Sequence, residues 1–241
     1  MAIRSLSDLG ALYPGAEILG VGAGNEPTIF YLTRKVRRVF ATDLYLDPGR
    51  WQDFAPASML TEPGSHWPFE WNARRLVVQH MNALDLQYED EAFDGIFSSS
   101  SVEHFGDLGA VSRSLDEMFR VLKPGGVLSI STEFRIEGAS PGIPESLMFD
   151  AAELIETIVG DRRWTLASPL NTDLSSATLA TEFVQSDLIG EFAEHLSKHG
   201  HFLYHELDSA IWPQIVLRVG EHKITSAHLA LRKSRSLGRH Q

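Results

Sequence analysis

Three side chains of this sequence are the best suited to move a proton, and two of them are adjacent: Glu103, His104 and Glu133. Imidazole has a reference pKa of about 6.5, so His104 is the side chain best matched to a general base at neutral pH. Either acid carries the charge to orient the ring, and Glu133 is the next candidate for the base. A simpler alternative stays open, in which Glu103 and His104 begin a helix and His104 makes a local hydrogen bond.

A glycine-rich turn earlier in the chain has the composition to hold a ligand for that chemistry. An apolar run enters the turn at residues 18–21, Pro27 begins a helix after it, and a second apolar run ends at Asp43. Glycines let backbone N–H groups approach a ligand, and an acid about 20 residues further on accepts hydrogen bonds from ribose hydroxyls. This order of strand, turn, helix, strand and acid predicts a βαβ unit that binds a nucleoside.

The glycine spacing separates two classes of nucleoside ligand. A dinucleotide site needs the pattern Gly-x-Gly-x-x-Gly, whose third glycine lets the helix pack beneath a pyrophosphate. After Gly22 and Gly24 that third place is held by Pro27. The spacing therefore disfavours a nucleotide-dependent oxidoreductase.

Two motifs indicate the family that the chain resembles. Residues 20–25 (GVGAGN) resemble motif I of class I S-adenosyl-L-methionine (SAM) methyltransferases, of the type 11 kind, and residues 120–126 (RVLKPGG) resemble the segment before their fifth strand. The resemblance is strong over residues 17–134. It implies SAM as the cofactor and an α/β, Rossmann-like fold of seven strands, mostly parallel with an antiparallel edge hairpin, with helices on both faces.

The resemblance also implies which residues bind SAM. They come from the glycine turn and the ends of the next three strands: Gly20, Val21, Gly22, Gly24, Asn25, Glu26, Asp43, Leu44, Asn82, Ala83, Leu84, Asp85 and Ser99. The family usually has an acid where this chain has Gly20. Two interpretations of Glu26 follow: it replaces that acid and holds the methionine ammonium of SAM, or it stabilises the positive end of a helix dipole beside Pro27.

Apolar patterns predict the elements that position these residues. Strands are expected at residues 18–21, 39–41, 76–81, 93–97, 127–132, 213–218 and 225–232, and helices at 6–12, from 27, at 108–122, 150–158 and 187–199. Residues 161–185 are polar and are expected to be irregular. The chain is interpreted as a single methyltransferase domain, 1–241, with its core at 17–134, substrate-side insertions and closing strands at 135–231, and a disordered tail at 232–241.

The segment after Asp43 is long and carries five aromatic side chains: Trp51, Phe54, Trp67, Phe69 and Trp71. Loops of this length are usually functional or locally helical. Each ring either stacks on the sugar or adenine of a ligand or covers the edge of the core. Covering the core is the expectation for each ring alone, but at least one of the five is expected to meet the ligand.

Composition limits the partners and the compartment. The formal charge is −11 and no basic stripe is apparent, so neither nucleic acid nor an anionic membrane is expected as a partner. The chain has no cysteine, which excludes disulfides and thiolate metal sites. The sequence contains no HExxH pair or Asp-x-Asp cluster that would indicate a metal, although a divalent cation such as Mg²⁺ stays open. His199 and His201 are weaker candidates for a site, because His199 followed by Gly200 is typical of a helix end. Without a signal peptide or a transmembrane-length run, a cytoplasmic protein is expected.

The acceptor is predicted from the side chains around the expected methyl group. A histidine base, acids at strand ends and a Trp-rich loop suggest methyl transfer to a hydroxyl of a polar small molecule or saccharide. Residues 146–150 and the closing strands resemble methyltransferases of bacterial glycan modification. Phenol, quinone or nitrogen acceptors stay open, as does a SAM-binding regulatory module without catalysis. The sequence predicts no oligomeric state.

Overall fold

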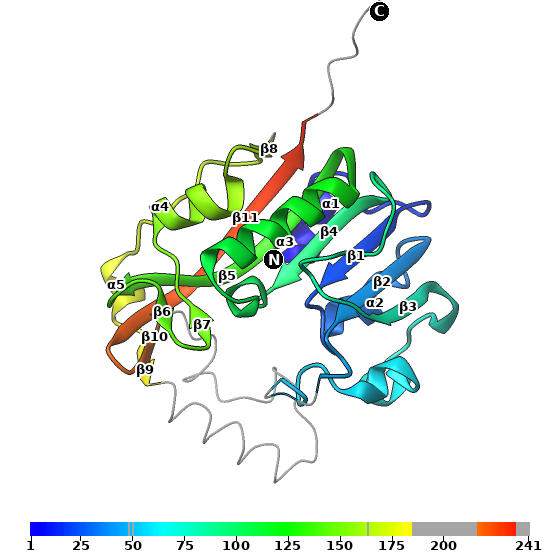
Figure 1. Ribbon diagram of the computed structural model, residues 1–241, viewed down its shortest axis with the longest axis horizontal. Helices are drawn as coiled ribbons and strands as arrows, with labels where there is room; N and C mark the ends of the chain where they lie inside the picture. Colours follow the sequence, from blue (N-terminus) through cyan, green and yellow to red (C-terminus); the bar gives the residue numbers. More distant parts are fainter. Residues whose placement is uncertain (48, 50, 163, 185–215, 235–241) are drawn as a thin grey trace, which may run out of the picture.

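One sheet organises the molecule (Figure 1). The structure, a computed structural model, describes residues 1–47, 49, 51–162, 164–184 and 216–234. Within them, nine strands form the sheet in the order β3-β2-β1-β4-β5-β11-β10-β9, and β8 pairs with β11. Their bounds are β1 Glu17–Val21, β2 Arg38–Asp43, β3 Leu76–His80, β4 Phe93–Ser99, β5 Leu122–Glu137, β8 Trp164–Leu166, β9 Glu182–Val184, β10 Val216–Val219 and β11 His222–Lys233.

The strand directions match the predicted fold class. β1 pairs in parallel with β2 and β4, while β2 pairs with β3 and β4 with β5, also in parallel. β11 runs antiparallel to both β5 and β10, which forms the predicted edge hairpin. The predicted Rossmann-like fold is confirmed, and the short strands β8 and β9 extend the seven strands that were expected.

Helices cover both faces of the sheet and create two cores. The helices are α1 Ala2–Asp8, α2 Pro27–Leu32, α3 Leu108–Val121, α4 Ala151–Leu154 and α5 Ser176–Leu179. Alternate residues of β1 point to opposite faces, so Leu19 packs with α3 and α4, whereas Ile18 packs with α1 and α2. The strands are therefore held from both sides, and their carboxyl ends can present residues with little freedom to move.

The segment after β2 is locally helical, as expected for its length. It contains three short 3₁₀ helices, at Ala57–Leu60, Pro63–His66 and Ala73–Arg75. Trp67 stacks on Phe30 at 5.7 Å between ring centroids, and Trp71 meets the same ring edge-on at 5.3 Å. These two tryptophans cover the core.

Several predicted boundaries were wrong. The first helix lies at Ala2–Asp8 rather than 6–12, and β5 begins at Leu122 rather than 127, so that it includes the KPGG segment that directly follows Leu122. The predicted helix 150–158 is an α-helical turn capped by Asp150 that continues as a π-helix over Ile155–Val159. The region predicted to be irregular contains β8, α5 and β9.

The predicted disordered tail was also wrong at its start. Arg232 donates hydrogen bonds to the carbonyls of Leu9 and Gly125, at 2.6 and 2.8 Å. Lys233 donates to the carbonyls of Phe119 and Leu122, both at 2.7 Å. Residues 232–233 are the end of β11, where Arg232 pairs with Val127 of β5 and with Thr165 of β8, and these side-chain bonds hold that end in place.

Some predictions fall outside the described residues. They are the helix at 187–199, His199, His201 and the first part of the strand at 213–218. No helix in the described ranges has the length and apolar character needed to span a bilayer.

Candidate active site

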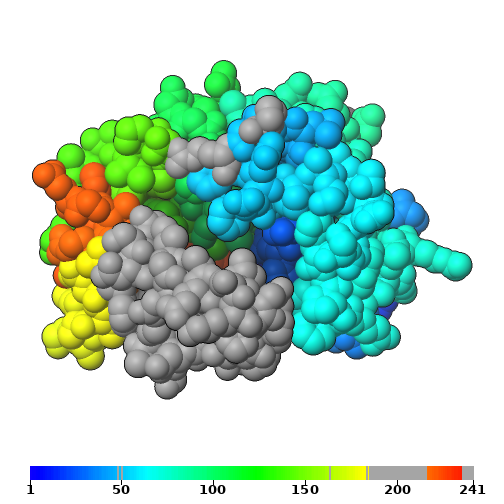
Figure 2. Space-filling model, turned by 90° about the horizontal axis from the view of Figure 1, so that it is seen from below, coloured from blue at the N-terminus to red at the C-terminus, as the bar shows by residue number. Residues whose placement is uncertain are grey.

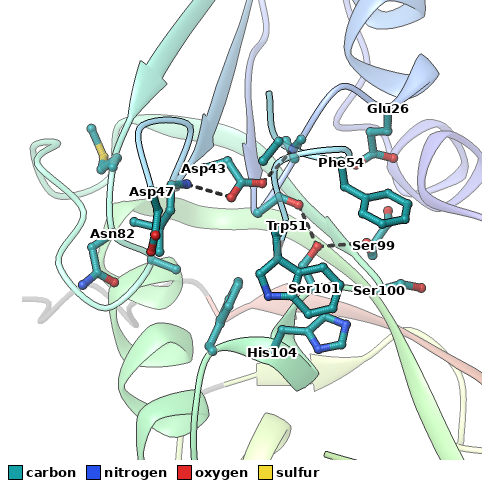
Figure 3. Close-up of a pocket in the computed structure, with 18 of the residues that line it drawn as sticks. Glu26, Asp43, Asp47, Trp51, Phe54, Asn82, Ser99, Ser100, Ser101 and His104 are labelled. Atoms are coloured by element: carbon teal, nitrogen blue, oxygen red, sulfur yellow. Dashed lines mark hydrogen bonds between the residues drawn. The ribbon is translucent and has the colours of Figure 1, made fainter. Parts of the chain in front are cut away.

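A cavity of about 620 Å³ opens at the carboxyl ends of β1, β2 and β4, where open α/β sheets place their ligands. Figure 2 shows this end of the molecule, with blue atoms of the amino-terminal part lying in a hollow beside the cyan segment that follows β2. The cavity joins two groups of side chains (Figure 3). Asp47 and Asn82 lie at one end, and Glu26, Phe54 and the serines after β4 lie at the other, with Trp51 and His104 between.

The glycine turn after β1 forms one wall. Gly22 and Gly24 have φ of 62° and 47°, a conformation that favours glycine. Neighbouring segments hold the turn through its backbone: Ser101 Oγ donates to the Gly22 carbonyl at 2.6 Å, and the Tyr45 hydroxyl donates to the Gly24 carbonyl at 2.7 Å. The N–H of Asn25 donates to the Phe54 carbonyl at 2.9 Å. One of the donors of the predicted motif is therefore used by the segment after β2.

Asp43 lies at the end of β2 and faces the turn. Its carboxylate accepts hydrogen bonds from the N–H groups of Gly24 at 2.8 Å and Leu44 at 2.7 Å. Burial raises the pKa of Asp43 above its usual range, and the two N–H groups oppose that shift. A carboxylate offers about four lone-pair positions, so two remain for further donors such as a pair of ribose hydroxyls.

Glu26 turns its carboxyl group into the cavity. It is the N-cap residue of α2, yet its side chain makes no capping hydrogen bond to that helix. Burial raises the pKa of Glu26 to about 7, while hydrogen bonds from the hydroxyls of Thr28 and Ser99 oppose the shift. A half-buried acid with this environment is poised to bind a cation.

The opposite end of the cavity is more apolar. Met81, Ala83, Leu84 and Leu44 contribute to its wall, and Asn82 accepts a hydrogen bond from the N–H of Leu84 at 2.9 Å through its side-chain oxygen. The bond to Leu84 orients the amide group of Asn82. A flat, partly polar ring such as adenine matches such a wall in shape and polarity.

His104 is held from two sides. It ends the 3₁₀ helix Val102–His104, its Nδ1 lies 2.8 Å from the carbonyl oxygen of Glu145, and its ring packs against Trp51 at 4.1 Å between centroids, tilted by 39°. A carbonyl only accepts hydrogen bonds, so this pairing requires the proton of the neutral ring to sit on Nδ1. The lone pair is then on Nε2, the nitrogen that a general base uses.

Ser100 has a strained backbone beside this histidine. Its φ of 47° is in the left-handed region, which costs energy for a residue with a side chain. Its N–H donates to the Ser131 carbonyl at 2.8 Å, which continues the β4–β5 pairing beyond the strand end. This left-handed conformation turns the chain after β4, and Ser99, Ser100 and Ser101 all line the cavity.

The structure brings most of the predicted site residues together. Those that line the cavity are Gly22, Gly24, Asn25, Glu26, Asp43, Leu44, Asn82, Ala83, Leu84, Ser99 and His104. Gly20 and Val21 lie in β1 below the turn, and Asp85 accepts a hydrogen bond from Gln87 instead. None of these three residues lines the cavity. Gly20 and Val21 precede the glycine turn that forms the wall. Asp85 follows Asn82, Ala83 and Leu84, which do line the cavity.

The two predicted catalytic acids do not line the cavity either. Glu103 is 1% exposed, and its Oε2 accepts a hydrogen bond from Thr132 Oγ1 at 2.8 Å, while Oε1 has no partner among the residues that the structure describes. Burial raises the pKa of Glu103 to about 8, helped by the nearby Glu133, and burial raises the pKa of Glu133 to about 7. The group that Nδ1 of His104 meets is thus a backbone carbonyl, where the sequence suggested one of these acids.

Sequence reasoning did not name several lining residues. They are Asp47, Gly49, Ala55, Met81, Ser100, Ser101 and Phe105. Trp51 and Phe54 were only part of a general expectation for the aromatic segment. The run of four serines that spans the end of β4 is the signal that pointed nearest to Ser100 and Ser101.

Comparison with known proteins finds a family match over part of the chain. Residues 19–130, a little under half of the chain, match the methyltransferase domain family. Over these residues the chain is similar to SAM-dependent methyltransferases. The match supports SAM as the methyl donor, the cofactor that the sequence predicted. A probable S-adenosylmethionine-dependent methyltransferase of Mycolicibacterium smegmatis is 34% identical over 90 residues, which are 35% of this chain and 34% of the relative.

Solved structures share the fold of this chain. A [4+2]-cyclase, SpnF, superposes with a TM-score of 0.61 at 23% identity, over 96% of this chain and 80% of the cyclase. Phosphoethanolamine N-methyltransferase 2 of Haemonchus contortus, in complex with SAM, gives 0.57 at 14% identity, over 97% of this chain and 52% of that one. Because the identities are low, these two show the fold alone.

The cavity fits the cofactor in three respects. Its volume lies within the roughly 300–1,000 Å³ typical of small-molecule sites. Asp43 retains acceptor capacity for two hydroxyls, and Glu26 supplies an acid for an ammonium group. A cluster of three or more histidine and acidic side chains able to hold a metal does not occur among the described residues.

Proposed function

We propose that this methyltransferase transfers the methyl group of SAM to a hydroxyl of a small molecule, with His104 as the general base. The observation that carries the proposal is the pairing of His104 Nδ1 with the Glu145 carbonyl, at 2.8 Å in the wall of the SAM cavity. This pairing leaves the basic lone pair on Nε2. A hydroxyl is a poor nucleophile until its proton is shared, so a base held in this tautomer has a clear use.

The cofactor residues take separate parts of SAM in this proposal. Asp43 accepts hydrogen bonds from the two ribose hydroxyls, and Glu26 faces the methionine ammonium. Asn82, Ala83 and Leu84 lie at the adenine end. When bound, SAM supplies an electrophilic methyl group on sulfur, and the remaining task of the protein is to hold the acceptor in line and remove its proton.

His104 Nε2 takes the hydroxyl proton as the acceptor oxygen forms its bond to the methyl carbon and the carbon–sulfur bond breaks. The resulting imidazolium keeps its Nδ1–H bond to Glu145. Trp51 limits rotation of the ring by packing against it. Trp51 also offers an aromatic face on which a saccharide can stack, and a saccharide hydroxyl is the narrower form of the proposal.

The test compares His104→Ala and His104→Gln with wild type in a panel of hydroxyl and amine acceptors, with demethylated cofactor as the measured product. Both variants should lower kcat by roughly 10²- to 10⁴-fold while SAM affinity is kept. Glutamine retains a donor for the Glu145 carbonyl and lacks the base, so it separates positioning from chemistry. The wild-type rate should fall at acid pH as the imidazole takes up a proton, and the variants should lose this dependence.

His66→Ala is the matched control, because His66 bonds Ser58 within the loop after β2 and does not line the cavity. Its kcat should equal that of wild type. Near-normal turnover of His104→Ala on a hydroxyl acceptor would contradict the base assignment. Turnover on amines alone would replace the hydroxyl with a nitrogen acceptor, and SAM binding without turnover on any acceptor would favour the regulatory module.

A further inference from the structure

The carbonyl that contacts His104 belongs to a short hairpin-like segment, residues 140–150, which we call the bracket. Within it, β6 (Gly142–Ile143) pairs antiparallel with β7 (Ser146–Leu147), and the Met148 N–H donates to the Pro141 carbonyl at 2.8 Å. Gly142 has a φ of 121°, which a side chain would strain. Glu145 lies in the turn between the two strands, at the tip of the bracket.

The base of the bracket is attached to the end of β5. The Arg135 N–H donates to the Phe149 carbonyl at 2.8 Å, and the Phe149 N–H donates to the Glu133 carbonyl at 3.0 Å. These two backbone hydrogen bonds set the register of the bracket on the sheet. Both bonds lie at one residue of the bracket, Phe149.

The Arg135 side chain supplies the additional attachment. It is 8% exposed and donates to the Met148 carbonyl, while its Nη2 lies 3.0 Å from both Asp150 Oδ2 and Glu153 Oε2. Asp150 and Glu153 form the capping box of α4, and Ser140 Oγ donates to Glu153. The planar guanidinium therefore joins the start of the bracket, its end and the following helix.

We infer that Arg135 is a positioning residue for the base: it holds the bracket so that the Glu145 carbonyl faces Nδ1 of His104 and keeps the reactive lone pair on Nε2. This rests on the proposed function, since a fixed tautomer matters only if His104 takes a proton. Arg135 reaches His104 only through this segment. A small displacement of the tip would release Nδ1, and the neutral ring would then exchange between its two tautomers.

The experiment combines ring ¹⁵N spectra of histidine-labelled full-length protein with kinetics of Arg135→Lys. Lysine keeps the charge but cannot reach three acceptors with a planar fork. In wild type above the pH at which the ring is protonated, the His104 signals should report a protonated Nδ1 and an unprotonated Nε2, assigned by their loss in His104→Gln. In Arg135→Lys they should move toward a mixture of tautomers, and kcat should fall roughly 10- to 100-fold with SAM affinity unchanged.

Arg120→Lys is the matched control. Arg120 also forms a fork, although it is 33% exposed, to Glu117, Asp90 and the carbonyls of Leu86 and Tyr88, and it does not line the cavity. Its substitution should lower thermal stability while leaving the His104 spectrum and kcat as in wild type. If both variants change only stability, Arg135 is merely structural and the inference is overturned.

A milder variant keeps the inference testable if Arg135→Lys does not fold. Glu153→Gln removes one charge partner of Arg135 and retains a polar side chain for the capping box. It should shift the tautomer signals in the same direction by a smaller amount; an unchanged spectrum would again overturn the inference. The spectra also separate this inference from the proposed function, because they report the tautomer even if His104→Ala proves that the base lies elsewhere.

Discussion

The two ends of the cavity are built in different ways. The cofactor end comes from β1, β2 and β3, and its contacts are made largely by the backbone: Asp43 accepts from the N–H groups of Gly24 and Leu44. The end that we propose for the acceptor comes from the exit of β4 and the segment after β2, and the bracket contacts it through Glu145. Its main contacts join side chains and carbonyls far apart in sequence, since His104 meets both Trp51 and Glu145.

This difference suggests that cofactor binding and methyl transfer depend on different parts of the cavity wall. A backbone-built site tolerates variation of side chains, so a glycine turn and one acid suffice to hold a common cofactor. A side-chain-built site changes with each insertion, so the acceptor end is where related proteins on one fold can differ in chemistry. If this is correct, substitutions at the two ends should change different measured quantities.

The largest expected effect is on the free energy of unfolding, and it concerns Glu103, the buried acid that precedes His104. Burial raises the pKa of Glu103 to about 8, above its usual value of 4.5. Between these values the folded protein keeps the proton that the unfolded chain loses, so the free energy of unfolding falls as pH rises. Glu103→Gln should remove up to about 1.4 kcal/mol per pH unit of this slope.

Denaturant unfolding of Glu103→Gln and wild type at several pH values between 5 and 9 would measure the slope. The variant should gain stability most at pH 9, and its turnover should stay near that of wild type because Glu103 does not line the cavity. Glu133→Gln is the comparison variant, since burial also raises the pKa of Glu133. A collapse of kcat in Glu103→Gln with intact folding would place this acid in the acceptor end after all.

The next effect tests the cofactor end. Asp43→Ala removes a carboxylate that we propose accepts from the ribose, and calorimetry should show SAM affinity reduced by about 1–3 kcal/mol. At saturating SAM, kcat should be nearly unchanged, because the lost hydrogen bonds stabilise the ground state and the transition state alike.

Asp47→Ala provides the control at the same end. Asp47 lines the cavity but accepts from Gly49 rather than from the glycine turn. It should lose much less affinity than Asp43→Ala. Equal losses, or a loss of folding in Asp43→Ala alone, would mean that Asp43 serves mainly to hold Gly24.

The same division explains how much could be predicted from the sequence. Motif I, the acid at Asp43 and the residues after β3 predicted the sheet and most of the residues at the cofactor end. Each of these signals depends on contacts between residues close in sequence, within βαβ units. The partner of His104 could not be predicted, because Glu145 acts through its backbone carbonyl, which every residue type possesses. Trp51 and Trp67 looked alike in sequence, yet one packs against His104 and the other stacks on Phe30.

The smallest expected effect decides between the two interpretations of Glu26. Burial raises the pKa of Glu26 to about 7, and its side chain does not cap the backbone N–H groups of α2. Only the carboxylate attracts an ammonium, so SAM affinity should weaken as pH falls below about 7, and binding at pH 7 should release protons. Glu26→Gln should cost about 1 kcal/mol of affinity above pH 8, because a neutral acceptor makes a weaker bond to a cation.

Calorimetry of SAM binding in two buffers with different ionisation enthalpies would count the released protons. Wild type should show proton release that disappears in Glu26→Gln, together with the dependence of affinity on pH. If Glu26 acted only on the helix dipole, its replacement should lower stability by roughly a few tenths of a kcal/mol and leave binding and proton release unchanged. The two interpretations predict changes in different quantities. This one variant therefore decides whether Glu26 replaces the acid that the family usually has at the position of Gly20 or acts only as a charge at a helix end.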